Sequence, residues 1–507
     1  MKVFSASQVR EWDQYTILKE PVSSLHLMER AAQQCYNWIV ENYHSADQFS
    51  IFCGKGNNGG DGLALARLLA KSGKTVQLHI LEYGFPGTID FQQNLARVHT
   101  CPTIQIQYIQ DETHLNEIGP DCIVVDALFG SGINRPLEGL SAAVVRAINH
   151  SNNPVIAIDI PSGLFCDRSS KGFPIVKATH TLGFTPKLSF YLQENNTYVG
   201  HLHLLDIGLH RNYSLENSAR FELLTHEKIT PLLKARELYS HKGNYGHALL
   251  IAGNIGKMGA CVLAARGALR SGLGLLSCFV PVTENTILQT AVPEAMTITE
   301  KLNPLSFNSV AIGPGIGVGT MQVELLEELL NTYSKPIVMD ADALTILSNH
   351  THLLKKVPSL SIFTPHIGEF IRLFGETDND FDRMELAIKK SKELNIIIIL
   401  KGQHTLVATP FEPYYINTSG NPGMAKGGAG DVLTGVILGL LAQGYNSIEA
   451  SIIGVYLHGK AGDLAAEMHT YYGMTTGDLI DSLGLAWKEL IVSQLLKNAS
   501  SKEPKLP

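Results

Sequence analysis

Short apolar, β-branched runs alternate with helical patterns along most of the chain. In the first half, apolar runs at 49–53, 76–81, 104–109, 122–126 and 155–160 predict buried strands, and residues 63–71 and 140–149 predict helices between them. The second half repeats the rhythm, with strands predicted at 247–252, 275–280, 310–313, 337–340, 362–364 and 396–400, and a helix at 431–442. The alternation in the first half predicts βαβ units and a parallel sheet, and its return in the second half predicts a separate α/β domain there.

The alternation lapses over a polar stretch at about residues 210–220. We therefore predict a first α/β domain over 1–210, a linker over 211–224 and a second α/β domain over 225–507. A chain of 507 residues is long enough for more than one domain.

Composition narrows the class of protein. Hydrophobic residues make up 45% of the chain and charged residues 17%, which is enough apolar material for large cores and excludes general disorder. The net charge of −7 argues against nucleic acid as a partner. No signal-peptide core and no membrane-length apolar run occurs, so we expect a cytoplasmic protein without a membrane partner.

The seven cysteines include no CxxC pair, and several of them lie in or beside apolar runs. This pattern favours buried, reduced thiols over a disulfide framework or a zinc site. The cysteines expected to be buried are Cys53, Cys122, Cys261 and Cys278.

The glycine-rich segment 54–62 follows a predicted strand and leads into a helix. Such a loop lets backbone N–H groups approach an anion at a helix N-terminus. Residues 54–59 also satisfy GxGxxG, and Glu82 ends the next predicted strand. Taken alone, this arrangement is typical of an NAD-dependent dehydrogenase. A glycine-rich turn required only by backbone geometry remains the alternative.

Two further predicted strands end in acids, Asp126 and Asp159. The carboxyl ends of parallel strands meet at one edge of a sheet, so both acids can converge on the glycine-rich segment. The alternative is that each aspartate has only a structural role and caps the segment that follows it.

The strings at 27–31, 57–62, 126–132 and 159–163 together resemble the NAD(P)H-hydrate epimerase family over about residues 5–208. The resemblance implies a Rossmann-like fold that interconverts the R and S forms of NADH or NADPH hydrated at C6 of the nicotinamide ring. It implies a potassium ion held by Asn58, Asp126 and Ser162, and one carboxylate with neutral oxygens suits such a cation. The implied acid/base is Asp159. The implied substrate contacts are Asn57, Asn58, Gly59, Gly60, Asp61, Gly130, Ser131, Gly132, Ile133, Asn134, Arg135, Pro136 and Asp159.

A second glycine cluster, Gly427, Gly428 and Gly430, precedes the apolar helix of the second half, and Asp431 lies in the first turn. The backbone there can wrap an anion, and Asp431 can take a proton from a hydroxyl group that attacks phosphorus. The alternative is a glycine-rich turn with Asp431 as a helix cap.

Gly-Ala-Gly-Asp before a helix resembles the ribokinase-like superfamily. Motifs at 242–247, 252–254, 257–272, 313–317, 340–344, 364–369 and 401–402 are similar to those of the ADP-dependent NAD(P)H-hydrate dehydratase family, over about residues 225–495. The resemblance implies that ADP phosphorylates the C6 hydroxyl of the S hydrate. Phosphate then leaves, giving NAD(P)H, AMP and phosphate. Phosphate is a far better leaving group than hydroxide, which agrees with this chemistry. Mg²⁺ is expected to neutralise the phosphoryl charge.

The second resemblance also implies site residues. Ala260, Gly317, His366 and Asp431 would contact the hydrated nucleotide. Lys426 replaces the family's usual Thr and can either contact a phosphate or lie on the surface in solvent. The implied ADP contacts are Lys401, Gly402, Gln403, His404, Thr405, Asn421, Pro422, Gly423, Met424, Ala425, Lys426, Gly427, Gly428, Ala429 and Gly430.

Together the two halves predict a fused repair enzyme, an isomerase and a lyase, acting on hydrated NADH and NADPH and expected to be a homo-oligomer. The runner-up is a ribokinase-like small-molecule kinase with an appended nucleotide-binding domain. A non-catalytic nucleotide sensor remains an alternative for the first half.

Overall fold

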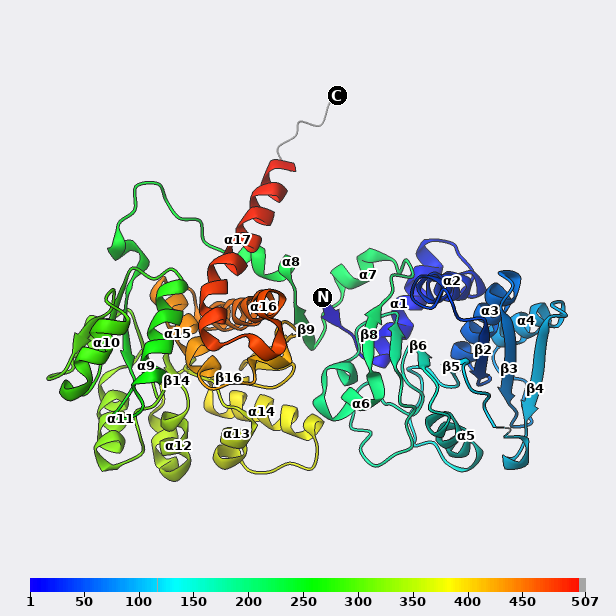
Figure 1. Cartoon of the computed structure of the whole chain (residues 1–507), viewed down its shortest axis with the longest axis horizontal. Helices are drawn as coiled ribbons and strands as arrows, with labels where there is room; N and C mark the ends of the chain where they lie inside the picture. The colour runs from blue at the N-terminus through cyan, green and yellow to red at the C-terminus, as the bar shows by residue number, and fades with distance from the viewer. Residues whose placement is uncertain (116, 501–507) are drawn as a thin grey trace. The chain divides into compact units, whose positions relative to one another are not determined.

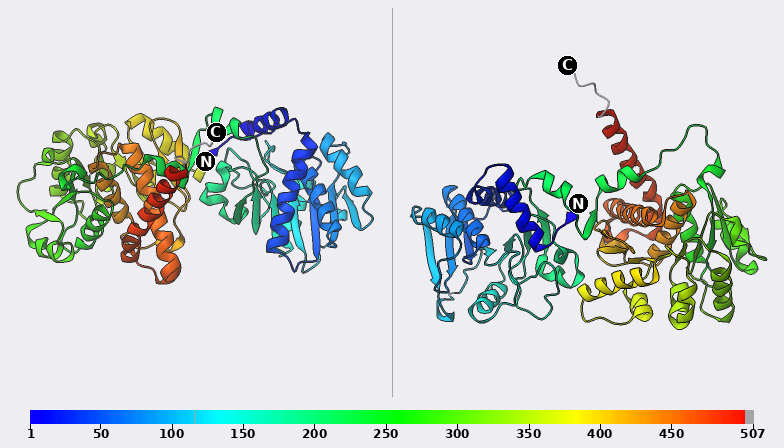
Figure 2. Two further views of the ribbon diagram at one scale, coloured as in Figure 1. Left: turned by 90° about the horizontal axis from the view of Figure 1, so that it is seen from above. Right: turned by 180° about the vertical axis from the view of Figure 1, so that it is seen from behind.

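The computed structural model describes residues 1–115 and 117–500. Residues 501–507, the end of the predicted second domain, lie outside the described residues. The chain divides into two compact units (Figures 1 and 2). We call residues 2–220 with 379–381 the N-terminal unit, and Met1 with 221–378 and the residues from 382 onward the C-terminal unit.

The N-terminal unit is built on a sheet of seven strands in the order β4-β3-β2-β5-β6-β7-β8, and every neighbouring pair is parallel. Five of the strands are those predicted from sequence. β7 and β8, at one edge, were not predicted. The strands are β2 (Gln48–Cys53), β3 (Thr75–Leu81), β4 (Ile104–Ile109), β5 (Ile123–Ala127), β6 (Val155–Ile158), β7 (His180–Gly183) and β8 (His201–Leu204).

Two hydrophobic cores cover the two faces of this sheet. One packs Ile51 and Leu78 against the helices that carry Ile39 and Leu65, and the other packs Phe52 against the helix around 144–148. The arrangement is that of a doubly wound α/β unit. Its helices are α1 (Ala6–Lys19), α2 (Ser24–Asn42), α3 (Asn57–Lys71), α4 (Ile89–His99), α5 (Gly139–His150), α6 (Asn196–Val199) and α7 (Arg211–Glu216).

Helix α3 begins at Asn57, so most of the predicted glycine-rich loop is the first part of a helix. Close packing explains the glycines. A Cβ at Gly59 would lie 1.7 Å from the carbonyl oxygen of Gly54, and a Cβ at Gly62 would lie 2.6 Å from the Cys53 sulfur. The helix therefore sits closer to β2 than side chains would allow, which brings its N-terminus to the carboxyl edge of the sheet.

The C-terminal unit has a mixed sheet with the order β9-β18-β17-β16-β15-β14-β13-β10-β11-β12. β16 pairs antiparallel with β17, and β17 with β18, while the other neighbours in this order are parallel. The predicted α/β class is confirmed for both units. The strands are β9 (Phe221–Leu224), β10 (His247–Ile251), β11 (Leu275–Phe279), β12 (Met296–Ile298), β13 (Ser309–Ile312), β14 (Ile337–Met339), β15 (Ile362–Phe363), β16 (Ile397–Leu400), β17 (Thr405–Ala408) and β18 (Tyr414–Asn417).

The segment expected to be a linker, 211–224, contains α7 and β9. The short apolar stretch after the polar residues explains the strand, since Phe221, Leu223 and Leu224 are buried. The division between the two compact units falls inside this segment, after Arg220.

Helix α15 is positioned in the C-terminal unit by its contact with α9. A Cβ at Gly435 would lie 1.9 Å from the carbonyl oxygen of Ala264, so the two helices approach closely. This packing fixes where α15 begins. The helices are α8 (His226–Ile229), α9 (Met258–Arg270), α10 (Asn285–Ala291), α11 (Thr320–Thr332), α12 (Asp342–Asn349), α13 (Ile367–Phe374), α14 (Asp380–Leu394), α15 (Ala429–Ala442), α16 (Ser447–Gly473) and α17 (Thr476–Ser500).

Among the described residues, no helix is long and apolar enough to cross a membrane. All seven cysteines are free, and the four expected to be buried are buried.

Candidate active sites

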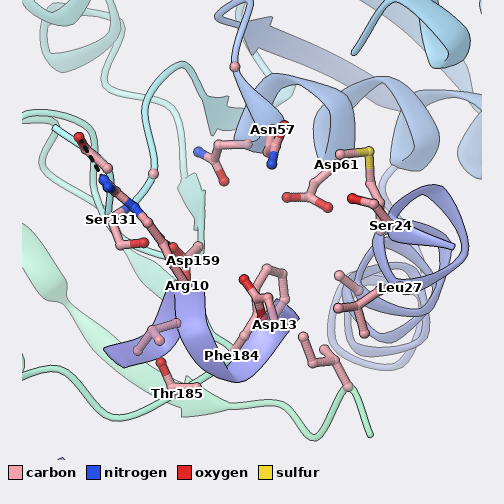
Figure 3. A pocket seen from close by; sticks show the side chains of 18 of the residues that line it. Arg10, Asp13, Ser24, Leu27, Asn57, Asp61, Ser131, Asp159, Phe184 and Thr185 are labelled. Atoms are coloured by element: carbon pink, nitrogen blue, oxygen red, sulfur yellow. Dashed lines mark hydrogen bonds between the residues drawn. The ribbon is translucent and has the colours of Figure 1, made fainter. Parts of the chain in front are cut away.

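A cavity of about 550 Å³ opens at the carboxyl edge of the N-terminal sheet. It is lined by residues of α1, α2 and the start of α3, and by the segments that follow β5, β6 and β7 (Figure 3). β3 and β4 extend the sheet from β2 in one direction, whereas β5 to β8 extend it in the other. Ligands of doubly wound sheets bind at such a reversal of strand order.

Most residues predicted to contact substrate line this cavity, but some do not. Gly59, Gly60 and the end of the 130–136 segment are absent from its lining. A Cβ at Gly60 would lie 2.6 Å from the Met28 sulfur, so this glycine has a packing role. The predicted residues that line the cavity are Asn57, Asn58, Asp61, Gly130, Ser131, Gly132, Ile133 and Asp159.

Asp159 follows β6 with a left-handed backbone, φ 65°. Its Oδ1 lies 2.7 Å from Nζ of Lys187, and its Oδ2 accepts a hydrogen bond of 3.3 Å from the backbone N–H of Ser131. Lys187 is only 1% exposed. A buried ammonium needs a counter-charge, and Asp159 supplies it from the cavity wall.

Asp13 and Asp61 also line the cavity, and Figure 3 shows both side chains directed into it. Burial is the largest cause that raises the pKa of Asp13 to about 7, and the nearby charge of Asp159 adds to it. Burial, with Asp159 and Asp13 adding, also raises the pKa of Asp61 well above its ordinary value. Three carboxyl groups, those of Asp13, Asp61 and Asp159, thus share one cavity.

The three residues predicted to hold potassium lie beside this cavity. Asp126 is fully buried, and it accepts hydrogen bonds from the Ser162 backbone N–H at 2.7 Å and the Ser162 hydroxyl at 2.6 Å. Burial raises the pKa of Asp126 to about 6, and these hydrogen bonds oppose the rise. The buried amide of Asn58 has no hydrogen-bond partner among the described residues at either its oxygen or its nitrogen. A buried amide oxygen without a partner and a buried carboxylate are the kinds of oxygen ligand that a weakly charged cation prefers.

The glycine cluster of the C-terminal unit forms the N-terminus of α15. Gly428 is the N-cap of the helix and has a left-handed backbone, with φ 91°. The space beside Gly427 is open, since a Cβ built there would have no neighbouring atom within 4 Å. The first N–H groups of a helix have no intrahelical acceptor, so this end can bind an anion. Asp431 lies in the first turn.

The loop before α15 is held in place by α16 and the residues after it. Asn421 donates a hydrogen bond of 3.0 Å to Asp463, and Thr476 donates one of 2.8 Å to the carbonyl oxygen of Gly427. The Lys426 ammonium donates to the carbonyl oxygens of Tyr472 and Met474. Lys426 therefore anchors the loop, a role that neither expectation for it included.

A buried carboxylate that was not predicted as a site residue lies beneath this loop. Asp340, 1% exposed, pairs with the Lys401 ammonium at 3.0 Å and accepts a hydrogen bond of 2.7 Å from the Thr434 hydroxyl. A Cβ at Gly430 would lie 3.1 Å from the Lys401 nitrogen. Burial raises the pKa of Asp431 to about 7, the charge of Asp340 adds to the rise, and Lys401 opposes it.

The remaining predicted residues lie near the carboxyl edge of the same sheet. The Gly317 N–H donates a hydrogen bond of 2.8 Å to Asp342, and Ala260 lies in α9, where a Cβ at Gly315 would approach its methyl group to 3.1 Å. His366 caps α13 through Nδ1, which accepts from Gly368 at 3.0 Å, and its backbone bridges to Lys401. Gly402, Gln403, His404 and Thr405 continue from Lys401 into β17.

The sequence therefore missed Asp13, Lys187 and Asp340. Asp340 directly follows the carboxyl end of β14, which is the signal that could have identified it. Lys187 lies beyond β7, a strand that the sequence did not predict. Asp13 lies within α1, and no spacing or strand end marks it.

Comparison with known proteins adds independent information. The family model described as NAD(P)H-hydrate dehydratase matches residues 248–484, and the model described as YjeF-related protein N-terminus matches residues 24–188. The chain is 35% identical to the bifunctional NAD(P)H-hydrate repair enzyme of Moorella thermoacetica, over 97% of each protein. It is 32% identical to the enzyme of the same name from Escherichia coli, over 90% of this chain and 88% of that one.

A solved structure is also similar. The ADP/ATP-dependent NAD(P)H-hydrate dehydratase of Bacillus subtilis, co-crystallised with ATP and Mg²⁺, is 33% identical. It covers 53% of this chain and 98% of its own, with a TM-score of 0.48.

Proposed function

The chain belongs to the family of bifunctional NAD(P)H-hydrate repair enzymes, and from that membership we propose that it repairs hydrated NADH and NADPH in two steps. It epimerises the R and S hydrates, and it dehydrates the S hydrate at the expense of ADP, so it is both an isomerase and a lyase. The observation that carries the proposal is 35% identity over 97% of the chain to a repair enzyme with both activities in its name.

We assign epimerisation to the cavity of the N-terminal unit. Asp159 is the proposed acid/base for the proton transfers at the C6 oxygen, because its carboxylate lines the cavity and is paired with buried Lys187. The N-terminus of α3, with Asn57 and Asn58, faces the same space and suits the phosphates of the nucleotide.

We propose that Asn58, Asp126 and Ser162 hold a potassium ion. The unpartnered amide of Asn58 and the buried Asp126 supply the oxygen ligands that such an ion prefers. The ion would supply a fixed positive charge next to the nucleotide. The Ser162 hydroxyl also accepts from the Phe129 N–H at 2.8 Å, which fixes the start of the 130–136 loop.

We assign dehydration to the N-terminus of α15. Asp431 is the proposed base: it takes the proton of the C6 hydroxyl while that oxygen attacks the β-phosphorus of ADP and AMP departs. The C6–O bond then breaks, phosphate leaves with the electron pair, and loss of the C5 proton restores the ring double bond. The amides from Gly427 to Gly430 stabilise the transferred phosphoryl group.

The ADP contacts proposed are residues 401–405 and 421–430, with Lys401 fixed by Asp340 beside the helix terminus. Mg²⁺ would enter with the phosphates. Protein sites usually bind Mg²⁺ through one or two carboxylates together with substrate phosphates. Among the described residues, no group of three His, Cys, Asp or Glu side chains could hold a metal ion.

The alternative is a small-molecule kinase, and its product differs. A kinase would leave a stable phosphorylated product, whereas the repair reaction releases inorganic phosphate and restores NADH absorbance. The test is to incubate the purified full chain with an R/S mixture of hydrated NADH and with ADP. We expect NADH, AMP and phosphate in equal amounts from both epimers. An accumulating phosphorylated nucleotide, or no recovery of NADH, would contradict the proposed function.

A further inference from the structure

The carboxyl group of Asp13 enters the epimerase cavity from α1, and that of Asp159 enters from the segment after β6. Figure 3 shows the two side chains directed toward the same space from these different elements. We propose that Asp13 is a second catalytic acid/base group of epimerisation, acting on the C6 oxygen in concert with Asp159. The proposal rests on the proposed epimerase function.

In epimerisation through a ring cation, the oxygen leaves one face of C6 and returns to the other, so two acid/base groups can divide the proton transfers between them. A carboxyl group on one wall of a cavity can serve one face. In the proposed step Asp13 gives its proton to the C6 hydroxyl, and the C6–O bond breaks with its electron pair on the departing water. The N1 lone pair stabilises the ring cation. A water then adds to the opposite face, and its proton passes to Asp159. The reverse reaction uses the same groups with exchanged roles.

The surroundings of the two carboxyl groups suit these different tasks. Asp159 is paired at 2.7 Å with the buried Lys187 ammonium, which holds its carboxylate in place as the group that accepts a proton. Asp13 has no hydrogen bond or ion pair with any described residue, and burial raises its pKa to about 7, so a large fraction is protonated at neutral pH. Two carboxyl groups whose environments separate their protonation states are the usual pattern of an acid and a base.

The other charged groups facing the cavity do not take this role. Arg10, one turn before Asp13, is directed to the carbonyl oxygen of Gly132 at 3.3 Å. Asp61 lies deeper in the wall than Asp13, and burial, with the nearby charges of Asp159 and Asp13 adding, raises its pKa well above the ordinary value. Asp13 is the carboxyl group whose pKa matches proton exchange at neutral pH.

The test uses the full chain and an equal mixture of R and S hydrates of NADH with saturating ADP, corrected for the rate without protein. In the unmodified protein the S form is consumed first, and the R form follows through epimerisation. In Asp13→Asn we expect the S form to be consumed at the unmodified rate and the R form at least ~100-fold more slowly. Asp13→Glu should recover part of the rate. Asp47→Asn, a matched change at an exposed aspartate, should alter neither phase.

Undiminished consumption of the R form by Asp13→Asn would overturn the proposal and leave the proposed function standing. Failure of the unmodified protein to consume the R form would instead refute the proposed epimerase function. If Asp13→Asn does not fold, the pH profile of the unmodified protein decides. We expect the kcat/KM of R consumption to fall tenfold per pH unit above about 7, and a rate independent of pH from 7 to 9 would overturn the proposal.

Discussion

The Lys401 ammonium lies 3.0 Å from the carboxylate of Asp340, directly beside the glycine-rich start of α15. The Thr434 hydroxyl, from the second turn of α15, donates to the other oxygen of the same carboxylate at 2.7 Å. Asp340 thus connects Lys401, a proposed ADP contact, to α15, the helix that carries the proposed base Asp431. Its carboxylate thereby positions both groups.

Replacing Asp340 should therefore weaken dehydration in two measurable ways. In Asp340→Asn we expect kcat/KM for ADP to fall by roughly 10- to 100-fold, because a charge-assisted hydrogen bond is lost. The pKa of Asp431 should also fall, because the nearby negative charge that raises it is removed. The pH profile of dehydration would then shift to lower pH, which a purely structural defect would not produce. Asp481→Asn, at an exposed ion pair, is the matched control and should leave the profile unchanged.

Lys187 should matter for both stability and epimerisation. Lys187→Met removes the partner of Asp159 and leaves a carboxylate at a largely buried position, which costs about 3 kcal/mol of unfolding free energy in comparable buried pairs. Denaturant unfolding would measure this loss. R-to-S conversion should fall by more than ~10-fold while dehydration of the S form persists. Lys177→Met, at an exposed lysine, should change neither quantity, and an unaltered epimerisation rate in Lys187→Met would refute the role assigned to the pair.

The two activities should respond to pH in opposite directions. Asp431 must be ionised to act as a base, and its pKa is raised to about 7, so kcat/KM for dehydration should rise tenfold per pH unit below that value and level off above it. Asp13 must be protonated to act as an acid, and its pKa is also about 7, so epimerisation should decline above it. Separate assays of dehydration and of epimerisation between pH 5 and 9 would measure the rise of the first rate and the decline of the second. Parallel profiles would contradict the roles given to these two aspartates.

Potassium should activate epimerisation through Asn58. We expect the rate in a sodium buffer to increase when potassium replaces sodium, and Asn58→Ala to require roughly tenfold more potassium for half-activation, because one oxygen ligand is lost. Dehydration of the S form serves as the internal control. An epimerisation rate that is the same in both salts would refute a potassium site at Asn58, Asp126 and Ser162.

Sequence patterns predicted the central strands well because those strands are buried on both faces and read as continuous apolar runs. The two strands at one end of the N-terminal sheet, β7 and β8, were missed. β7 and β8 carry His180, His201 and His203 within four-residue strands, so they lack such runs. The start of α3 at Asn57 was missed because asparagine and glycine have low helix propensity, and only the close fit against Gly54 and Cys53 explains a helix there.

Site residues, too, could be predicted where a local sequence pattern marks them and not where only the packing of distant segments brings them together. Asp159 and Asp431 could be predicted because each belongs to a local motif at a strand end or helix start. Asp13 and Lys187 could not, because their role depends on distant segments folding around one cavity. Asp13 looks like an ordinary polar residue of an amphipathic helix until α1 packs beside the loop that contains Gly132.

The most direct test of the central claim is the dehydration rate of Asp431→Asn, measured with the S hydrate of NADH and ADP. The amide keeps the shape of the side chain and its place at the start of α15 but cannot accept the hydroxyl proton. We predict a decrease of at least ~100-fold in kcat, with ADP binding retained and with R-to-S conversion unchanged. ADP-dependent formation of NADH at the unmodified rate would contradict the assignment of this carboxylate and this helix terminus as the dehydratase site.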